Sequence, residues 1–181
     1  ARQMRDKYKA SLYVVDSVGV GDGVAARLEE TDQSEGRAQV LRIVGGASPI
    51  EDYAVNRPPD MQPHFANLKS QMWWYMRDSV LDRAISFPDN GDTPILLGQL
   101  AAMKYKIQSD KKIVVETKES YKKRAGKSPD RADAAVMGVW GLRFAPDPAD
   151  YFDHLDDDDY DTAAKQKIFS NYGLRARLRP S

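Results

Sequence analysis

Cysteine is absent from the 181 residues of the chain, and its absence excludes several kinds of chemistry. The protein has no disulfide bonds, no thiolate nucleophile and no cysteine-ligated metal site. Long apolar runs are also missing, and none approaches the ~20 residues that cross a bilayer. The sequence begins without a positively charged leader followed by an apolar core and a cleavage site. We therefore expect a soluble, intracellular protein with no membrane partner.

Neither sign of charge is in excess, because 27 lysine and arginine residues balance 27 aspartate and glutamate residues. The total charge therefore gives no indication of a nucleic-acid partner. The charges are unevenly spread, with a basic stretch over residues 104–131, an acidic one over residues 147–161 and a basic end over residues 175–179. A run of acidic residues cannot build a core. We expect one domain over residues 1–144 and an acidic, then basic, tail over residues 145–181.

A short apolar strand is predicted over residues 12–16, and it ends in a carboxylate, Asp16. A tight turn with Gly19 and Gly21 follows, then a helix and a second β-rich segment over residues 40–44. The order helix, strand, helix, strand predicts an α/β fold with parallel strands and crossover helices. Ligands bind at the carboxyl ends of such strands. Asp16 is therefore a candidate metal-binding or acid–base residue, and a helix-capping or turn aspartate is the structural alternative.

A second pair of carboxylates, Asp130 and Asp133, lies at the start of a mostly apolar helix predicted from Arg131 to about Trp140. A spacing of three residues places both side chains on one helix face, and the helix dipole favours acidic residues in the first turn. First-turn acids therefore need no catalytic explanation by themselves. If they converge with Asp16, however, they could hold Mg²⁺ or Mn²⁺ for phosphodiester hydrolysis.

Five cations precede this helix: Lys118, Lys122, Lys123, Arg124 and Lys127. Such a run either forms a solvated face or follows a phosphate backbone, and the pattern alone leaves both open.

Two further patterns predict secondary structure. The helical pattern of residues 64–85 places the aromatic residues 73–75 in the core rather than on a base-stacking surface. Residues 104–107 and 112–116 predict a pair of strands.

Several segments resemble a known family when they are taken in order. The first is Asp16 to Val24, followed by Arg27-Leu28, and the second is Phe65 to Trp74, followed by Arg77-Asp78 and residues 85–88. Further segments are Gln99-Leu100 with Lys104-Tyr105, and residues 116–119 continuing through 122–124 to 127–134. Their order and spacing, from Tyr8 to Trp140, resemble the nuclease domain of the large terminase subunit of tailed bacteriophages.

The resemblance implies a ribonuclease-H-like mixed sheet flanked by helices, and an endonuclease that uses Mg²⁺ or Mn²⁺, expected as two ions. That family cuts concatemeric double-stranded DNA during genome packaging, which places a phage or prophage protein in the host bacterial cytoplasm. The partners it implies are double-stranded DNA, an upstream ATPase motor domain, the portal and the small terminase subunit. Asp16 looks like the second of three metal-binding acids and Asp133 like the third, with Asp130 as a helper or substitute. Gly19 and Gly21 would leave room for a phosphate beside the metals, and the five cations would hold DNA.

The sequence departs from the family pattern at two points. The family's first acid lies on the opening strand of a three-stranded antiparallel unit, and we expect these strands to be missing here. No Walker A loop of the ATPase motor occurs either. Two alternatives stay open: a non-catalytic DNA-binding or packaging-assembly module, and another ribonuclease-H-like nuclease of the resolvase or transposase type. A nucleotide-binding loop over residues 19–23 is disfavoured by its glycine spacing and its internal aspartate.

Overall fold

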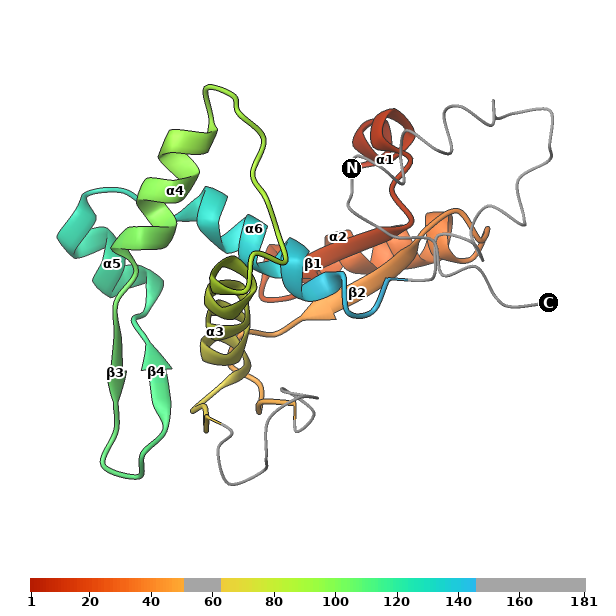
Figure 1. Cartoon of the computed structure of the whole chain (residues 1–181). Coiled ribbons are helices and arrows are strands. Elements are labelled where there is room, and N and C mark those ends of the chain that lie inside the picture. Colours follow the sequence, from red (N-terminus) through yellow and green to blue (C-terminus); the bar gives the residue numbers. More distant parts are fainter. Residues whose placement is uncertain (51–62, 146–181) are drawn as a thin grey trace, which may run out of the picture. The chain divides into compact units, whose positions relative to one another are not determined.

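A computed structural model describes residues 1–50 and 63–145, which belong to one unit spanning Ala1–Ala145 (Figure 1). The tail predicted over residues 145–181 lies outside the described residues, apart from Ala145. In chain order the elements are α1 (Arg2–Tyr8), β1 (Leu12–Asp16), α2 (Val20–Leu28), the π-helical turn η1 (Glu29–Gln33), β2 (Gln39–Ile43), α3 (Leu68–Leu81), α4 (Thr93–Ala102), β3 (Tyr105–Ile107), β4 (Ile113–Val115), α5 (Lys118–Ala125) and α6 (Asp130–Gly141). None of the described helices is both long enough and apolar enough to cross a membrane.

Strands β1 and β2 pair in parallel, from Leu12 opposite Gln39 to Asp16 opposite Ile43, and helix α2 forms the crossover between them. The predicted α/β order and the parallel pairing are therefore confirmed. A continuous apolar run is typical of a strand that is buried in a parallel sheet, but residues 12–15 of β1 are only half-buried. The reason is that β1, within the described ranges, has a neighbouring strand on one side only. No described antiparallel strand precedes β1, which the chain enters from α1.

The core lies between the sheet, α3, α6 and β4. Helix α3 begins after Asn67, whose side chain accepts a hydrogen bond from the Ser70 N–H at 2.9 Å. Of the aromatic residues on α3, Trp73 is buried and Tyr75 meets the fully buried Trp140 of α6 edge-on, at 5.5 Å between ring centroids. The prediction that these aromatic residues belong to the core is confirmed.

Helix α6 packs directly along β1. Its buried residues, Ala132, Val136 and Trp140, recur every four positions and form one apolar face. At its C-terminal end, a Cβ atom on Gly141 would overlap the Val14 side chain, so glycine permits this close approach. The N-terminal boundary differs slightly from the prediction. Pro129 has non-helical backbone angles and precedes the helix, so Asp130 is the first helical residue.

Strands β3 and β4 form an antiparallel hairpin, as the sequence predicted, with Lys106 opposite Val114. The hairpin extends away from α4 and α5 in Figure 1. The basic run that follows it forms helix α5. Thr117 caps the start of α5 by accepting a hydrogen bond from the Ser120 N–H, and Gly126, with φ +76°, ends it.

A buried charge cluster ties α1 to the sheet. The Asp32 carboxylate is fully buried in η1, a segment that we expected to be a polar loop. It accepts a hydrogen bond from the Tyr13 hydroxyl at 2.6 Å and lies 3.0 Å from Arg2 Nε and 3.0 Å from Arg5 NH1. Because a buried carboxylate is costly without partners, these three contacts explain why η1 can bury it.

Candidate active site

The carboxylate of Asp16 stands at the carboxyl end of β1, where the sheet meets a sharp turn. Gly19 has φ +65°, a left-handed conformation that glycine adopts easily. A Cβ atom on Gly21 would overlap the carbonyl oxygen of Asp16, so the first turn of α2 lies directly against the strand end. The two predicted turn glycines therefore have distinct structural tasks. Gly19 reverses the chain, and Gly21 lets α2 start close to Asp16.

The hydroxyl group next to Asp16 is also notable. Ser17 Oγ is buried and has no hydrogen-bond partner in the part of the chain that the structure describes. Buried polar groups in folded proteins are nearly always paired with protein, water or a ligand. An unpartnered hydroxyl beside an exposed carboxylate is consistent with a site that holds a polar ligand or an ion.

The two other predicted acids come from the first turn of α6. Asp130 is exposed, whereas the Asp133 side chain is only 24% exposed. One ammonium group lies between them: Lys118 Nζ is 2.7 Å from Asp130 Oδ1 and 3.8 Å from Asp133 Oδ2. The charge of Asp16 also reaches Lys118 and raises its pKa, although less than the hydrogen bond to Asp130 does. The structure thus places Asp130 and Asp133 around one cation, and the charge of Asp16 acts on the same ammonium group.

The two acids of α6 differ in their electrostatic environment. The hydrogen bond from Lys118 is the main cause that lowers the pKa of Asp130. Burial raises the pKa of Asp133, against the opposing effect of the Lys69 and Lys118 charges and of a hydrogen bond from Trp73. Partial burial and specific charged neighbours that perturb a carboxyl pKa are common at functional sites. Asp133 therefore has the stronger features of a functional acid.

Two residues that the sequence analysis missed help to form this arrangement. Gln99 of α4 accepts a hydrogen bond from the Ala132 N–H at 3.1 Å, so it satisfies one of the free amide groups at the start of α6. Lys69 lies in the first turn of α3, and its Nζ donates to the carbonyl oxygen of Glu116 at 3.2 Å. The sequence did contain a signal for Lys69. A cation in the first turn of a helix opposes the helix dipole, so its presence there indicates a specific contact.

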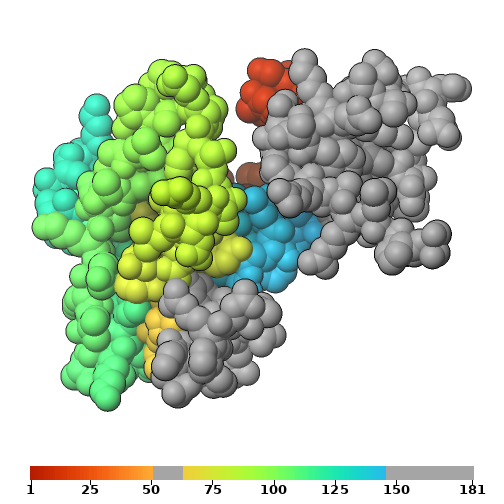
Figure 2. Space-filling view, in the orientation of Figure 1, coloured from red at the N-terminus to blue at the C-terminus, as the bar shows by residue number. Residues whose placement is uncertain are grey.

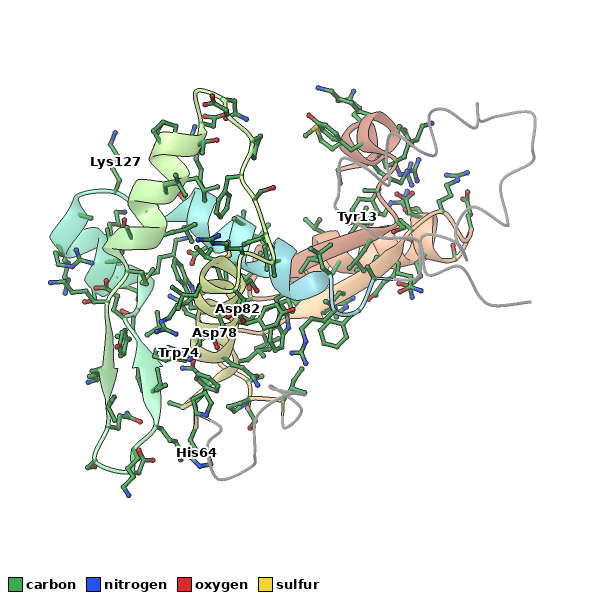
Figure 3. The ribbon with its side chains drawn as sticks, in the orientation of Figure 1. Tyr13, His64, Trp74, Asp78, Asp82 and Lys127 are labelled. Atoms are coloured by element: carbon green, nitrogen blue, oxygen red, sulfur yellow. The ribbon has the colours of Figure 1, made fainter. Side chains whose placement is uncertain are left out.

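The five predicted DNA-binding cations do not form one uniform surface. Lys118 belongs to the acidic cluster, and the guanidinium of Arg124 bonds to the Glu116 carboxylate and to the Ala102 carbonyl oxygen. Lys122 and Lys123 are exposed on α5. Lys127 is exposed just beyond that helix, and Figure 3 shows its side chain extending outward. Three of the five are therefore available to an external partner, while two have structural contacts.

The candidate metal ligands fit a hard cation in type, because Mg²⁺ and Mn²⁺ prefer carboxylate oxygens. Across residues 1–50 and 63–145, however, no group of three or more aspartate, glutamate or histidine side chains is close enough to hold an ion. Asp16 and Asp133 could hold a metal between them only with further ligands from water, substrate or another segment. The candidate ligands therefore match Mg²⁺ or Mn²⁺ in chemical type, but they supply only part of a coordination shell.

No known protein family and no curated protein matches the chain. Among solved structures, the nuclease domain of the large terminase subunit gp2 of bacterial virus Sf6 matches it with a TM-score of 0.58. The identity is 21%, over 77% of this chain and 69% of that domain. The chain has the fold of a terminase nuclease domain. A variant of the same Sf6 domain with manganese also matches at 0.58 and 21%, over 77% of this chain and 70% of that one.

A further variant of the Sf6 domain, determined with calcium, gives the same TM-score and identity. The predicted resemblance to terminase nuclease domains and the ribonuclease-H-like fold class are thus confirmed at the level of the fold.

Proposed function

We propose that this chain is a nuclease domain of a phage large terminase subunit and that it cuts double-stranded DNA with a divalent metal ion. One observation carries the proposal. Asp130 and Asp133 at the start of α6 flank Lys118, and the charge of Asp16 at the end of β1 acts on the same ammonium group, in a fold whose solved structural neighbours are nuclease domains. The neighbours determined with manganese or calcium support Mg²⁺ or Mn²⁺ as the cofactor, with two ions expected.

In this proposal Asp16 and Asp133 hold the metal, and Asp130 assists. When bound, the metal neutralises the phosphate and activates a water molecule for attack. Lys118 holds the two acids of α6 together and offers a positive charge to the scissile phosphate. Gly19 keeps a side chain out of the turn beside Asp16, where nothing lies within 4 Å of its Cβ position, and this leaves space for a DNA phosphate. Gly21 contributes by letting α2 start directly against the strand end.

A third carboxylate would complete the site. The open edge of β1 is the natural place for it, because a strand paired there would end beside Asp16. We therefore infer that a segment outside the described residues, or another chain, adds this strand and its acid. Processing of concatemeric DNA in the host cytoplasm, together with an ATPase motor, the portal and a small subunit, belongs to the same proposal.

The test combines metal binding with DNA cutting. Binding of Mn²⁺ by calorimetry and nicking of supercoiled plasmid in Mn²⁺, Mg²⁺ or EDTA are measured for the parent and for Asp16→Asn. We expect Mn²⁺ binding that weakens at least tenfold in the variant, and metal-dependent nicking that falls about 100-fold or more because one ligand is lost. Asp22→Asn is the matched control, since Asp22 lies in the same turn but pairs with Arg42.

Equal nicking by the parent and Asp16→Asn would contradict the assignment, and so would a folded parent that neither binds Mn²⁺ nor cuts. The second candidate function is a non-catalytic DNA-binding module. It is favoured by the lack of a three-ligand group within the described ranges. Tight DNA binding by the parent without Mn²⁺ binding or cutting would select this candidate.

A further inference from the structure

The β3–β4 hairpin has two chemically different faces. The register places Lys106 opposite Val114, and because side chains alternate along a strand, Lys104 and Lys112 lie on the same face as Lys106. The opposite face carries Tyr105, Ile107, Ile113 and Val115, whereas Val114 shares the face of Lys106. We call the first of these the lysine face.

The apolar face fixes the hairpin to the domain. Ile113 and Val115 are buried in the core. The ring of Tyr105 meets Trp74 of α3 edge-on at 5.1 Å, and the guanidinium of Arg77 lies over the same indole at 4.7 Å. Figure 3 shows Trp74 between α3 and the hairpin. Because one face is anchored in this way, the lysine face is turned away from the core.

The three lysines are open to a partner. Lys104, Lys106 and Lys112 are all exposed, and Figure 2 shows the hairpin projecting from the surface. Neither Lys104 nor Lys106 forms an ion pair with a residue that the structure describes, and Lys112 pairs with Asp110 at 3.0 Å. The hairpin from Lys104 to Lys112 thus carries four lysines and one acid.

The base of the hairpin is joined to α5, the helix that carries the exposed Lys122 and Lys123. Glu116 accepts a hydrogen bond from the Lys104 backbone N–H at 2.9 Å and also binds Arg124 of α5, so it joins the base of the hairpin to that helix. Lys118 follows two residues later and reaches the acidic cluster. The hairpin, α5 and the candidate site are therefore linked through Glu116 and Lys118.

We propose that the lysine face of the β3–β4 hairpin binds the phosphate backbone of duplex DNA beside the cleavage site. This inference rests on the proposed nuclease function and adds a second contact surface to it. Lys112 is four strand residues from Glu116, about 13 Å at ~3.3 Å per residue. Thirteen ångströms correspond to roughly four base pairs at ~3.4 Å each, so the lysine face is long enough to follow the phosphates of about four base pairs.

The test is the salt dependence of duplex binding in EDTA, which needs no catalysis. Each lost phosphate contact lowers the slope of log K against log salt by ~0.9. The double variant Lys104→Gln with Lys106→Gln should therefore lower the slope by about 1.8. If both proteins bind equally at 1 M salt, this slope change makes the variant about 60-fold weaker at 0.1 M.

The matched control removes the same charge elsewhere, with Lys7→Gln and Lys9→Gln at the end of α1, and its slope should equal that of the parent. An unchanged slope in the hairpin variant, or a duplex affinity too weak to measure in the parent, overturns the inference. The lysines would then protect an exposed strand edge or contact a protein. If the hairpin variant lowers the slope as expected but Asp16→Asn nicks DNA like the parent, the DNA-binding role of the lysine face is supported. The assignment of the nuclease site is then rejected.

Discussion

The α-carbon of Gly21 lies so close to the carbonyl oxygen of Asp16 that a methyl group on it would overlap that oxygen. The first turn of α2 and the end of β1 are therefore in direct backbone contact. The position of the Asp16 side chain depends on this contact, because any displacement of α2 would move the strand end that carries it.

Replacement of Gly21 by alanine should both destabilise the fold and impair the site. We expect Gly21→Ala to cost about 1–3 kcal/mol of unfolding free energy, because the methyl group must push α2 away. Gly23→Ala in the same helix is the control: nothing lies within 4 Å of its Cβ position. It should gain up to about 1 kcal/mol from helix propensity. Urea denaturation measures both, and an equal response of the two variants would contradict the close approach.

The two acids of α6 should not be equivalent in metal binding. Asp133→Asn should abolish Mn²⁺-dependent nicking and weaken Mn²⁺ binding at least tenfold, because its carboxylate is partly desolvated and surrounded by cations. Asp130→Asn should reduce both only a few-fold, since Asp130 is exposed and acts through Lys118. Calorimetric titration with Mn²⁺ compares them. A larger effect from Asp130→Asn would reverse the assignment.

The buried charge cluster around Asp32 should make stability depend on pH. The hydrogen bond from Tyr13, followed by the Arg5 and Arg2 charges, lowers the pKa of Asp32 in spite of its burial. A lowered folded-state pKa stabilises the protein above the unfolded pKa of ~3.9, and this contribution is lost as the pH falls through the folded value. Asp32→Asn should cost about 3 kcal/mol at pH 7. The difference in melting temperature from the parent should shrink below about pH 4.

The contact between α6 and β1 can be tested by a double-mutant cycle. Gly141→Ala should cost about 1–3 kcal/mol, because its methyl group would overlap Val14. Val14→Ala removes the opposing methyl groups, so the double variant should be more stable than the sum of the two losses by about 1 kcal/mol. Gly138→Ala, with nothing within 4 Å of its Cβ position, is the control without a clash, and it should gain up to about 1 kcal/mol from helix propensity. Strict additivity would show that the two residues do not touch.

The features that could be predicted from the sequence are those that depend on short stretches of neighbouring residues. Asp16 ends an apolar strand before glycines, and Asp130 and Asp133 open an apolar helix, so strand, turn and helix start were all visible in short windows. The contacts that join these parts span long separations. The hydrogen bond between Gln99 and Ala132, for example, joins residues 33 positions apart, and no local sequence pattern predicts it. The basic run was visible as charge, but only the packing of α5 separates Lys118 and Arg124 from the exposed Lys122 and Lys123.

The described residues that flank residues 51–62 are hydrogen-bonded to the rest of the domain on both sides. The side-chain amide of Gln71 exchanges two hydrogen bonds with the backbone of Ile50, at 2.8 and 2.6 Å. On the other side, Ile113 donates its N–H to His64 at 2.8 Å and accepts one from Ala66 at 3.1 Å. These bonds tie Ile50 to α3 and residues 64–66 to β4. A substitution such as Gln71→Leu, which removes both bonds to Ile50, should therefore free the backbone of Ile50 while leaving residues 64–66 in place.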